Sequence, residues 1–383
     1  MKKNIFKSNG FQSLLASLLC IVLGLFLGYL VLLVINPAGA GEAILTVVKN
    51  FLTYKKTSSQ LKYLGNTLVK TAPLLMCALS ILFAYKVGMF NIGAAGQYCA
   101  GACAALYAAL AWNMPWYVCI LLGMLAGALL GMLAGALRTL FNVNVVISGI
   151  MLNWITLYLT NLVLGTVKNP TSPYTKTLQS TNPGALIPSL GLEKLFNNEK
   201  SVTIAIPIAV LTAVLVWVVL NKTKFGYELK ATGLNKNAAK YCGMAEKRNI
   251  ILSLMISGAL AGMGAAMLYL TSYEQWQCSS SSVPAMGFNG IAAAFLGGLN
   301  PIGSIFASFF IQHITAGGAY VDKSMYCAQI SDLISSIIIY LCGFVFFMKY
   351  VMKKMIAKRE EAAKLATEKE TAEEDKNEGG ENK

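Results

Sequence analysis

Six amide and aromatic side chains occupy unusual places in a very apolar chain, beside glycine-rich breaks or within apolar runs. They are Asn91, Gln97, Asn153, Trp154, Tyr158 and Asn289. Burying an amide without a partner costs roughly 1–3 kcal/mol, whereas amides and aromatic rings together can hydrogen-bond to a planar solute and stack on it. The chemistry open to these residues is non-covalent binding of a polar solute, and we predict that they line its path.

Catalytic and metal-binding constellations are missing from the sequence. His313 is the single histidine, so a histidine-based metal cluster or catalytic pair cannot form. The nine cysteines contain no Cys-x-x-Cys pair, which argues against metal-binding and thioredoxin-like sites. The chain also lacks a Gly-x-x-x-x-Gly-Lys-Ser/Thr pattern and cannot itself cradle the phosphates of ATP. We therefore expect a protein that is not an enzyme and holds no metal or cofactor.

An apolar helical framework must position the six side chains. Hydrophobic residues make up 56% of the 383 and charged residues only 13%, whereas soluble domains carry about 25% charged residues. A spanning helix needs about 20 apolar residues, and ten segments qualify or nearly qualify. They are 12–35, 67–86, 91–111, 116–137, 145–165, 202–220, 250–270, 286–300, 302–319 and 327–349. The composition therefore predicts an all-α membrane protein with about ten transmembrane helices.

The distribution of positive charge orients these spans. Ten spans place both termini on one side, and the loops of that side hold most of the Lys and Arg residues that precede the tail, so both termini are predicted to be cytoplasmic at the cell membrane. The net charge of +14 follows from this topology and calls for no nucleic-acid partner. The outer segment 42–64 carries several lysines and is interpreted as an interfacial amphipathic helix. The outer loop 166–201 contains four prolines and is expected to be ordered against the mouth.

These predictions divide the chain into three parts. Residues 1–65 form an N-terminal helix and the outer amphipathic segment, 66–350 the membrane core, and 351–383 a charged cytoplasmic tail that is expected to fray into disorder. The N-terminal apolar run exceeds a signal-peptide core of roughly 7–15 residues and is predicted to be retained. Cys278 and Cys327 both fall in predicted outer loops, where a disulfide between them is an open alternative.

One loop, 221–249, carries seven Lys and Arg residues against the two acids Glu228 and Glu246, which places it on the cytoplasmic side. Its middle part, roughly 227–241, can form a short amphipathic helix. The loop resembles the coupling loop of importer permeases of the ATP-binding-cassette class, in the branched-chain amino acid, simple-sugar and nucleoside group. The resembling positions are Gly226, Ala231, Gly233, Asn235, Ala238, Ala239 and Gly243. An ordinary positively charged cytoplasmic loop is the alternative.

Two further segments resemble motifs of the same permeases. Residues 88–97, GMFNIGAAGQ, are similar to the F-N-I-G-x-E-G-Q motif, with Ala95 where the family commonly has Glu. Residues 144–153, NVVISGIMLN, are similar to a segment that ends in M-L-N, with Asn144 where the family often has Glu. Both departures remove a charge, so no role that needs a motif acid is transferred to these positions.

A third segment, 287–303, resembles G-F-D-G-I-A-V-A-L-L-G-x-x-x-P-x-G, with Asn289 in place of Asp. The short echo between its Gly-Phe-Asn start and the Gly-x-x-Asn of residues 88–91 is consistent with two related five-helix halves. The four resembling segments follow one another over about residues 66–345, which makes the resemblance strong despite the three lost acids.

The resemblance implies a transmembrane subunit of a type II-like importer, similar to the larger of two paired permeases in nucleoside uptake systems. The expected partners are an ATPase subunit that binds ATP, a second permease in a heterodimer, an extracellular substrate-binding lipoprotein and membrane lipid. Simple sugars and branched-chain amino acids are alternative solutes. An ion-coupled carrier is the other alternative, although such carriers place carboxylates within the membrane and only Asp332 could lie there before the tail.

Overall fold

Helices account for most of the chain in the computed structural model, which describes residues 9–322 without a break and only short stretches between 324 and 358. The helices of the described residues, in order, are α1 (Asn9–Ile35), α2 (Ala40–Lys49), η2 (Asn50–Thr53), α3 (Thr57–Tyr85), α4 (Ala94–Leu110), α5 (Trp116–Leu140), α6 (Val145–Gly165), α7 (Leu178–Thr181), η3 (Pro183–Ala185), α8 (Leu192–Leu195), α9 (Ala205–Lys222), α10 (Lys224–Leu234), α11 (Lys236–Tyr241), α12 (Glu246–Tyr269), α13 (Ala285–Leu296) and α14 (Pro301–Gly318). β-Structure in the same residues is confined to two isolated bridges. The all-α prediction is confirmed for this part of the chain.

Nine of the ten predicted apolar segments coincide with helices: α1, α3, α4, α5, α6, α9, α12, α13 and α14. Six helices of the described residues are long and apolar enough to cross a membrane, namely α1, α3, α5, α6, α9 and α12. The protein is therefore a multi-pass membrane protein. The tenth segment, 327–349, and the tail 351–383 lie largely outside the described residues, as do Cys327 and Asp332. Cys278 is a free cysteine in this structure, and its pairing with Cys327 stays an open alternative.

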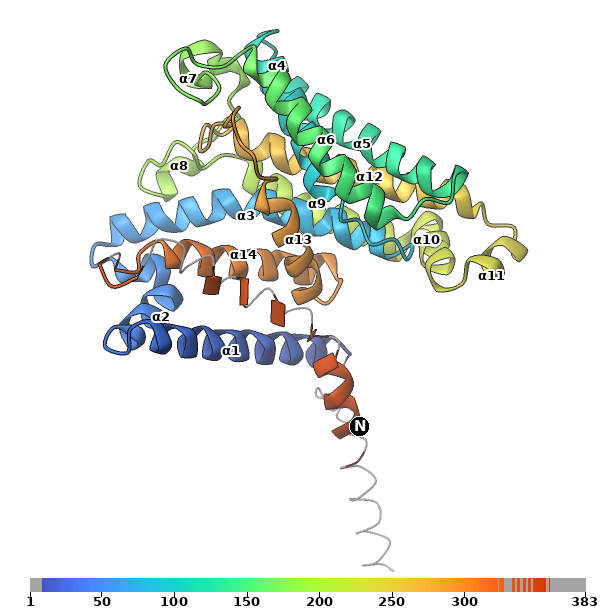
Figure 1. Ribbon diagram of the computed structural model, residues 1–383, viewed down its shortest axis with the longest axis horizontal. Coiled ribbons are helices and arrows are strands. Elements are labelled where there is room, and N and C mark those ends of the chain that lie inside the picture. The colour runs from blue at the N-terminus through green and yellow to red at the C-terminus, as the bar shows by residue number, and fades with distance from the viewer. Residues whose placement is uncertain are drawn as a thin grey trace, which may run out of the picture.

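The centre of the bundle is formed by α3 and α12, whose most apolar stretches are 89% and 72% buried, whereas that of α1 is 22% buried and faces outward. Figure 1 shows α1, α2 and α14 on one side of α3, with α4, α5 and α6 on the other. The α10–α11 segment projects at one end of the bundle, and α7 and α8 lie at the opposite end (Figure 1).

Glycines bring α5 and α12 into direct backbone contact. A Cβ built on Gly258 would lie 2.1 Å from the carbonyl oxygen of Gly127, and one on Gly131 would lie 2.1 Å from that of Leu254. Every larger residue would force these backbones apart. Close approach through small residues is the usual way in which membrane helices associate without a hydrophobic driving force between them.

The outer segment differs from the single interfacial helix predicted over 42–64. Helix α2 and η2 pack on α14, where Asn50 donates a hydrogen bond to the carbonyl oxygen of His313 (3.0 Å) and the Nε2 atom of His313 lies 2.8 Å from the carbonyl oxygen of Val48. Residues 57–64 instead form the first turns of α3. The segment is interrupted between η2 and α3, because the backbone of Tyr54 and Lys56 is extended and no helix can continue through it.

Candidate functional site

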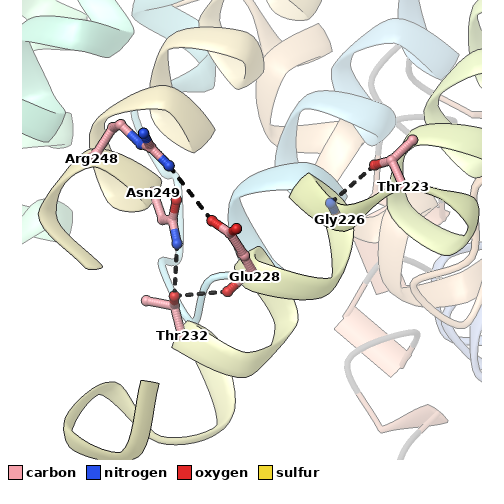
Figure 2. Close-up of polar contacts among 6 residues, drawn as sticks. All are labelled: Thr223, Gly226, Glu228, Thr232, Arg248 and Asn249. Carbon is pink, nitrogen blue, oxygen red and sulfur yellow. Dashed lines mark hydrogen bonds and ion pairs between the residues drawn. The ribbon is translucent and has the colours of Figure 1, made fainter. Parts of the chain in front are cut away.

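The α10–α11 element, residues 224–241, consists of two short helices, each started by a side-chain cap. Thr223 Oγ1 accepts a hydrogen bond from the amide of Gly226 at 3.1 Å and begins α10 (Figure 2). Asn235 Oδ1 accepts one from the amide of Ala238 at 3.1 Å and begins α11. Such caps satisfy amides that a helix start leaves free. The element therefore consists of two short helices that meet at Asn235, whereas the sequence predicted one short helix over roughly 227–241.

Polar contacts attach this element to the first turn of α12. Asn249, which is fully buried, donates a hydrogen bond to Thr232 Oγ1 at 3.1 Å, and Thr232 in turn donates to the carbonyl oxygen of Glu228 at 2.8 Å (Figure 2). The Arg248–Glu228 ion pair spans 3.6 Å, but the Arg248 side chain is 63% exposed, and such pairs contribute little to stability. The buried Asn249–Thr232 bond is thus the stronger attachment.

The motif glycines of the element face the rest of the protein. A Cβ on Gly226 would lie 2.2 Å from the carbonyl oxygen of Val219 in α9, and one on Gly233 would lie 2.3 Å from that of Lys86 at the end of α3. The turn beneath Gly233 contains Gly88 at φ +77°, a conformation that favours glycine. These glycines therefore let α10 rest directly on the backbone of α3 and α9.

The remaining predicted coupling positions of the element differ in burial. Ala239 is buried and Ala231 half-buried, whereas Ala238 is exposed. Gly243 lies just beyond α11 at φ +77°, with open space where a Cβ would stand. Of the seven predicted coupling positions, Gly226, Ala231 and Ala239 are at least half-buried, and the other four are exposed on the surface of the element.

Large apolar side chains cover the outward face of the element instead. Tyr227 is 66% exposed, Leu234 88% and Tyr241 93%. The same loop also carries exposed cations, among them Lys224, Lys240 and Lys247. These three apolar residues, which we call the apolar anchors, did not emerge from the sequence reasoning. Their spacing of seven residues within a charged loop is the signal that could have found them, because apolar residues of a charged loop are expected to turn inward.

A second site, the amide junction, lies inside the bundle where α4 begins. Asn91 Nδ2 donates to Gln97 Oε1 at 2.8 Å and to Ser257 Oγ of α12 at 2.7 Å. Ser257 Oγ in turn lies 2.9 Å from Ser80 Oγ of α3. Asn91 and Gln97 are each 1% exposed. The junction therefore ties α3, the start of α4 and α12 together through polar groups that already have protein partners.

Asn153 extends this junction from α6. Its Oδ1 accepts a hydrogen bond from the amide of Gly96 at 2.7 Å, and its Nδ2 donates to the carbonyl oxygen of Ile92 at 3.1 Å. The contact is close enough that a Cβ on Gly96 would lie 2.8 Å from Asn153 Cα. Both ends of the buried amide are satisfied, so Asn153 joins α6 to the first turn of α4 in this conformation.

The structure does not bring the predicted aromatic residues to the junction. Trp154 and Tyr158 stack on each other with ring centroids 6.2 Å apart, on a face of α6 where they are 43% and 58% exposed. Asn289 is half-buried on α13 and makes no side-chain hydrogen bond with the described residues. Of the six predicted path residues, three therefore lie together, and three lie elsewhere.

The first turn of α13 contacts the first turn of α4 beside the junction. A Cβ on Gly287 would lie 2.5 Å from Cα of Ala95, the fully buried residue that stands where the resembling motif has Glu. A carboxylate at position 95 would have no space beside Gly287 here, which accounts for a small residue at this place. Within the residues that the structure describes, no group of three or more His, Cys, Asp or Glu could hold a metal ion.

Comparison with known proteins finds the same class of transporter along most of the chain. A family model described as branched-chain amino acid transport system / permease component matches residues 63–343. The guanosine ABC transporter permease protein NupP of Bacillus subtilis (strain 168) is 31% identical over 348 residues, 89% of this chain and 96% of that protein. The nucleoside ABC transporter permease protein NupB of Lactococcus lactis subsp. cremoris (strain MG1363) is 31% identical over 373 residues, 94% of this chain and 100% of that protein.

A second Bacillus subtilis (strain 168) protein, the guanosine ABC transporter permease protein NupQ, is 30% identical over 261 residues, 64% of this chain and 77% of that protein. No solved structure matches the chain.

Proposed function

The chain belongs to the family of branched-chain amino acid transport system permease components, and from this premise we propose that it is the membrane-spanning subunit of an ATP-driven importer for nucleosides. It is a transport subunit and not itself an enzyme. The proposal of nucleosides is supported by two relatives that are named for guanosine and nucleoside transport and that match over nearly their whole length. ATP is bound and hydrolysed by a separate subunit, and transport proceeds by alternating access.

The α10–α11 element is the proposed contact with that ATPase, and the observation that carries this is its outward apolar surface. Tyr227, Leu234 and Tyr241 are large, exposed and grouped on one short element at the end of the bundle. Tyrosines are among the residues that contribute most of the binding energy when a partner buries them, and Leu234 adds apolar area beside them. The inward-facing glycines and the buried Asn249–Thr232 bond hold the element firmly enough to transmit a push into α3, α9 and α12.

The finer topology follows from the same proposal. If the α10–α11 element is cytoplasmic, then α4, α13 and α14 cross or partly cross the membrane with the six long helices, and a span over 327–349 completes ten. The short helices α4 and α13, whose first turns touch, would be equivalent elements of two related halves, and both termini would be cytoplasmic.

Three further partners belong to the proposal. NupP and NupQ are both named as guanosine transporter permeases of one organism, which supports a second, sister permease in a heterodimer with this chain. An extracellular binding lipoprotein would deliver the solute, and membrane lipid would cover the exposed faces of α1, α5 and α6.

The test is ATP-driven uptake by the complex of this chain, its sister permease, its ATPase and its binding protein in liposomes. The double substitution Leu234→Ser and Tyr241→Ser should abolish the stimulation of ATP hydrolysis by solute-loaded binding protein, because it removes two apolar anchors without touching a buried contact. Loss of two anchors should weaken the ATPase contact by roughly 2 kcal/mol or more. The matched control is Leu195→Ser, because Leu195 is also exposed, at 64%, but lies on α8 at the opposite end of the bundle.

Both variants should reach the membrane with unchanged thermal stability. Normal stimulation by the Leu234→Ser, Tyr241→Ser variant would show that the element is an ordinary charged loop. Uptake driven by a pH gradient without the ATPase would instead establish an ion-coupled carrier.

A further inference from the structure

A cavity of about 600 Å³ opens at the end of α12 that lies farthest from the α10–α11 element. It is formed by the end of α12, the connection to α13 and one residue of the loop that follows α6. Its lining residues are Tyr174, Tyr269, Glu274, Gln275, Trp276, Gln277, Ser280, Ser282, Val283, Pro284 and Ala285. Small-molecule sites usually occupy about 300–1,000 Å³, so the cavity has the size of a solute site.

Hydrogen bonds fix the wall of this cavity before any solute arrives. The Trp276 indole N–H donates to Asn161 Oδ1 of α6 at 2.9 Å, and Asn161 Nδ2 donates to the carbonyl oxygen of Ser280 at 2.8 Å. The loop after α6 is joined on by the β-bridge between Tyr174 and Gln277. A wall tied to α6 in this way is pre-organised, which reduces the ordering cost of binding.

The polar groups that face the cavity remain available for a ligand. Gln275, Gln277 and Ser282 make no side-chain hydrogen bond with the residues that the structure describes. This contrasts with the amide junction, where Asn91, Gln97 and Asn153 are already paired. Two free amides can each offer a donor and an acceptor, the pattern that the edge of a nucleobase requires.

The charges at the cavity favour a neutral solute with hydroxyl groups. Glu274 is its only charged lining residue, and it forms a 2.8 Å ion pair with Lys70 of α3, outside the lining. A carboxylate accepts hydrogen bonds from hydroxyls but repels phosphate. Trp276 and Tyr269 are buried in the wall, and Tyr174, 40% exposed, is the lining aromatic that is open to stacking on a base. The set therefore fits a nucleoside, and the carboxylate disfavours a nucleotide.

We propose that this cavity is the outward-facing nucleoside site of the permease, with Gln275 and Gln277 reading the base and Glu274 receiving ribose hydroxyls. The inference rests on the proposed function and assigns to it a site away from the sequence-predicted path residues. The cavity also meets the transport core. Its lining residues Val283 to Ala285 lead into α13, whose Gly287 lies close to Ala95 at the start of α4. An occupant of the cavity would therefore contact the start of α13, the helix that packs on the first turn of α4 beside the amide junction.

The first experiment fills the cavity. Ser282→Trp places an indole in it without removing a side-chain hydrogen bond, and Ser281→Trp places the same group on the next exposed residue, which does not line the cavity. With ATP, binding protein and guanosine, the initial uptake of the Ser282→Trp complex should fall about tenfold or more, as expected when an apolar plug enters a solute path. Uptake by the Ser281→Trp complex should stay near wild type, with equal assembly of both variants.

The second experiment distinguishes a site from a passive vestibule. Gln277→Ala should lower guanosine uptake about fivefold, the effect of one hydrogen bond, and should change the ratio of guanosine to cytidine uptake. A vestibule would leave that ratio unchanged. In the wild-type complex, photolabelling with 8-azidoadenosine should modify residues 269–285 or Tyr174, and excess ribose or guanosine monophosphate should not prevent it.

Two failures can be told apart. If the wild-type complex imports no nucleoside, the proposed function and this site are both wrong. If it imports nucleosides but the Ser282→Trp and Gln277→Ala complexes behave like wild type, or if the photolabel maps elsewhere, the importer stands and the assignment of the cavity is overturned. Protection by ribose alone would replace the nucleoside with a sugar as the ligand.

Discussion

The buried centre of the bundle and the α10–α11 element are built from the same residue types but use them in opposite ways. At the centre, amides pair with one another or with backbone, as Asn91 does with Gln97 and Asn153 does with Gly96, and glycines such as Gly258 bring backbones together. In the α10–α11 element, Gly226 and Gly233 also press inward, but they leave an opposite face covered by exposed apolar side chains.

This difference separates positions that build the permease from positions that meet other molecules. At the centre, the motif amides are buried and paired, whereas most motif positions of the α10–α11 element are exposed and act through a close backbone contact, a cap or a turn. The surfaces that are free to bind, the apolar anchors and the unpaired glutamines of the cavity, lie outside the motifs. Substitutions should therefore affect assembly in the first class and function in the second.

The largest effect is expected at the α5–α12 crossing. Gly258→Ala would place a Cβ 2.1 Å from the carbonyl oxygen of Gly127, so the two helices must separate, at a cost of roughly 3 kcal/mol or more for overpacking a close contact. We expect little or no assembled chain in the membrane, measured by size-exclusion chromatography of the detergent-solubilised complex. Gly165→Ala is the control, since no atom lies within 4 Å of a Cβ at Gly165, and normal yield from both variants would refute the close contact.

A smaller loss of stability is expected from Asn153→Leu. The variant removes the hydrogen bonds to Gly96 and Ile92, and because interhelical bonds in membranes contribute about 0.6–1.7 kcal/mol each, the melting temperature should fall by several degrees. The uptake rate per assembled complex should change little. Trp154→Leu, one residue along and exposed, should leave stability unchanged. If Asn153→Leu instead keeps wild-type stability and loses uptake, Asn153 lines the solute path as its sequence position predicts.

The framework was predictable from sequence because it depends on local signals. Apolar run length located nine helices, Pro284 and Pro301 bounded the short α13, and the positive charge and glycines of 221–249 marked the α10–α11 element. The partners of individual side chains were not predictable, because they depend on how distant helices cross. Asn153 and Gly96 are 57 residues apart, and nothing in either motif indicates that they bond. The cavity was missed for the same reason, since Tyr174 and Gln277 meet only through long-range packing.

The smallest effect is expected at the cap of α11, where it tests whether the outward face must be held rigid. Asn235 Oδ1 accepts a hydrogen bond from the amide of Ala238, and replacing such a cap by alanine costs about 1 kcal/mol. Because α11 has only six residues, this loss should loosen the helix without affecting the bundle. Asn235→Ala should therefore leave the melting temperature unchanged and speed hydrogen exchange of the α11 amides about fivefold.

A looser α11 leaves Tyr241, its last residue, without a fixed position. Binding of the ATPase must then order Tyr241 again, which weakens the contact. Stimulation of ATP hydrolysis by Asn235→Ala should fall by about fivefold or less, since the cost cannot exceed the lost cap of about 1 kcal/mol. Asn237→Ala is the matched control, because Asn237 is exposed within α11 and makes no side-chain hydrogen bond with the described residues, and alanine favours the helix. Equal stimulation by both variants, together with faster exchange in Asn235→Ala alone, would show that the apolar anchors work without a rigid α11. The α10–α11 element would then differ from the buried centre only in the exposure of its side chains. Its contact with the ATPase would need the apolar anchors themselves but not a fixed position for them.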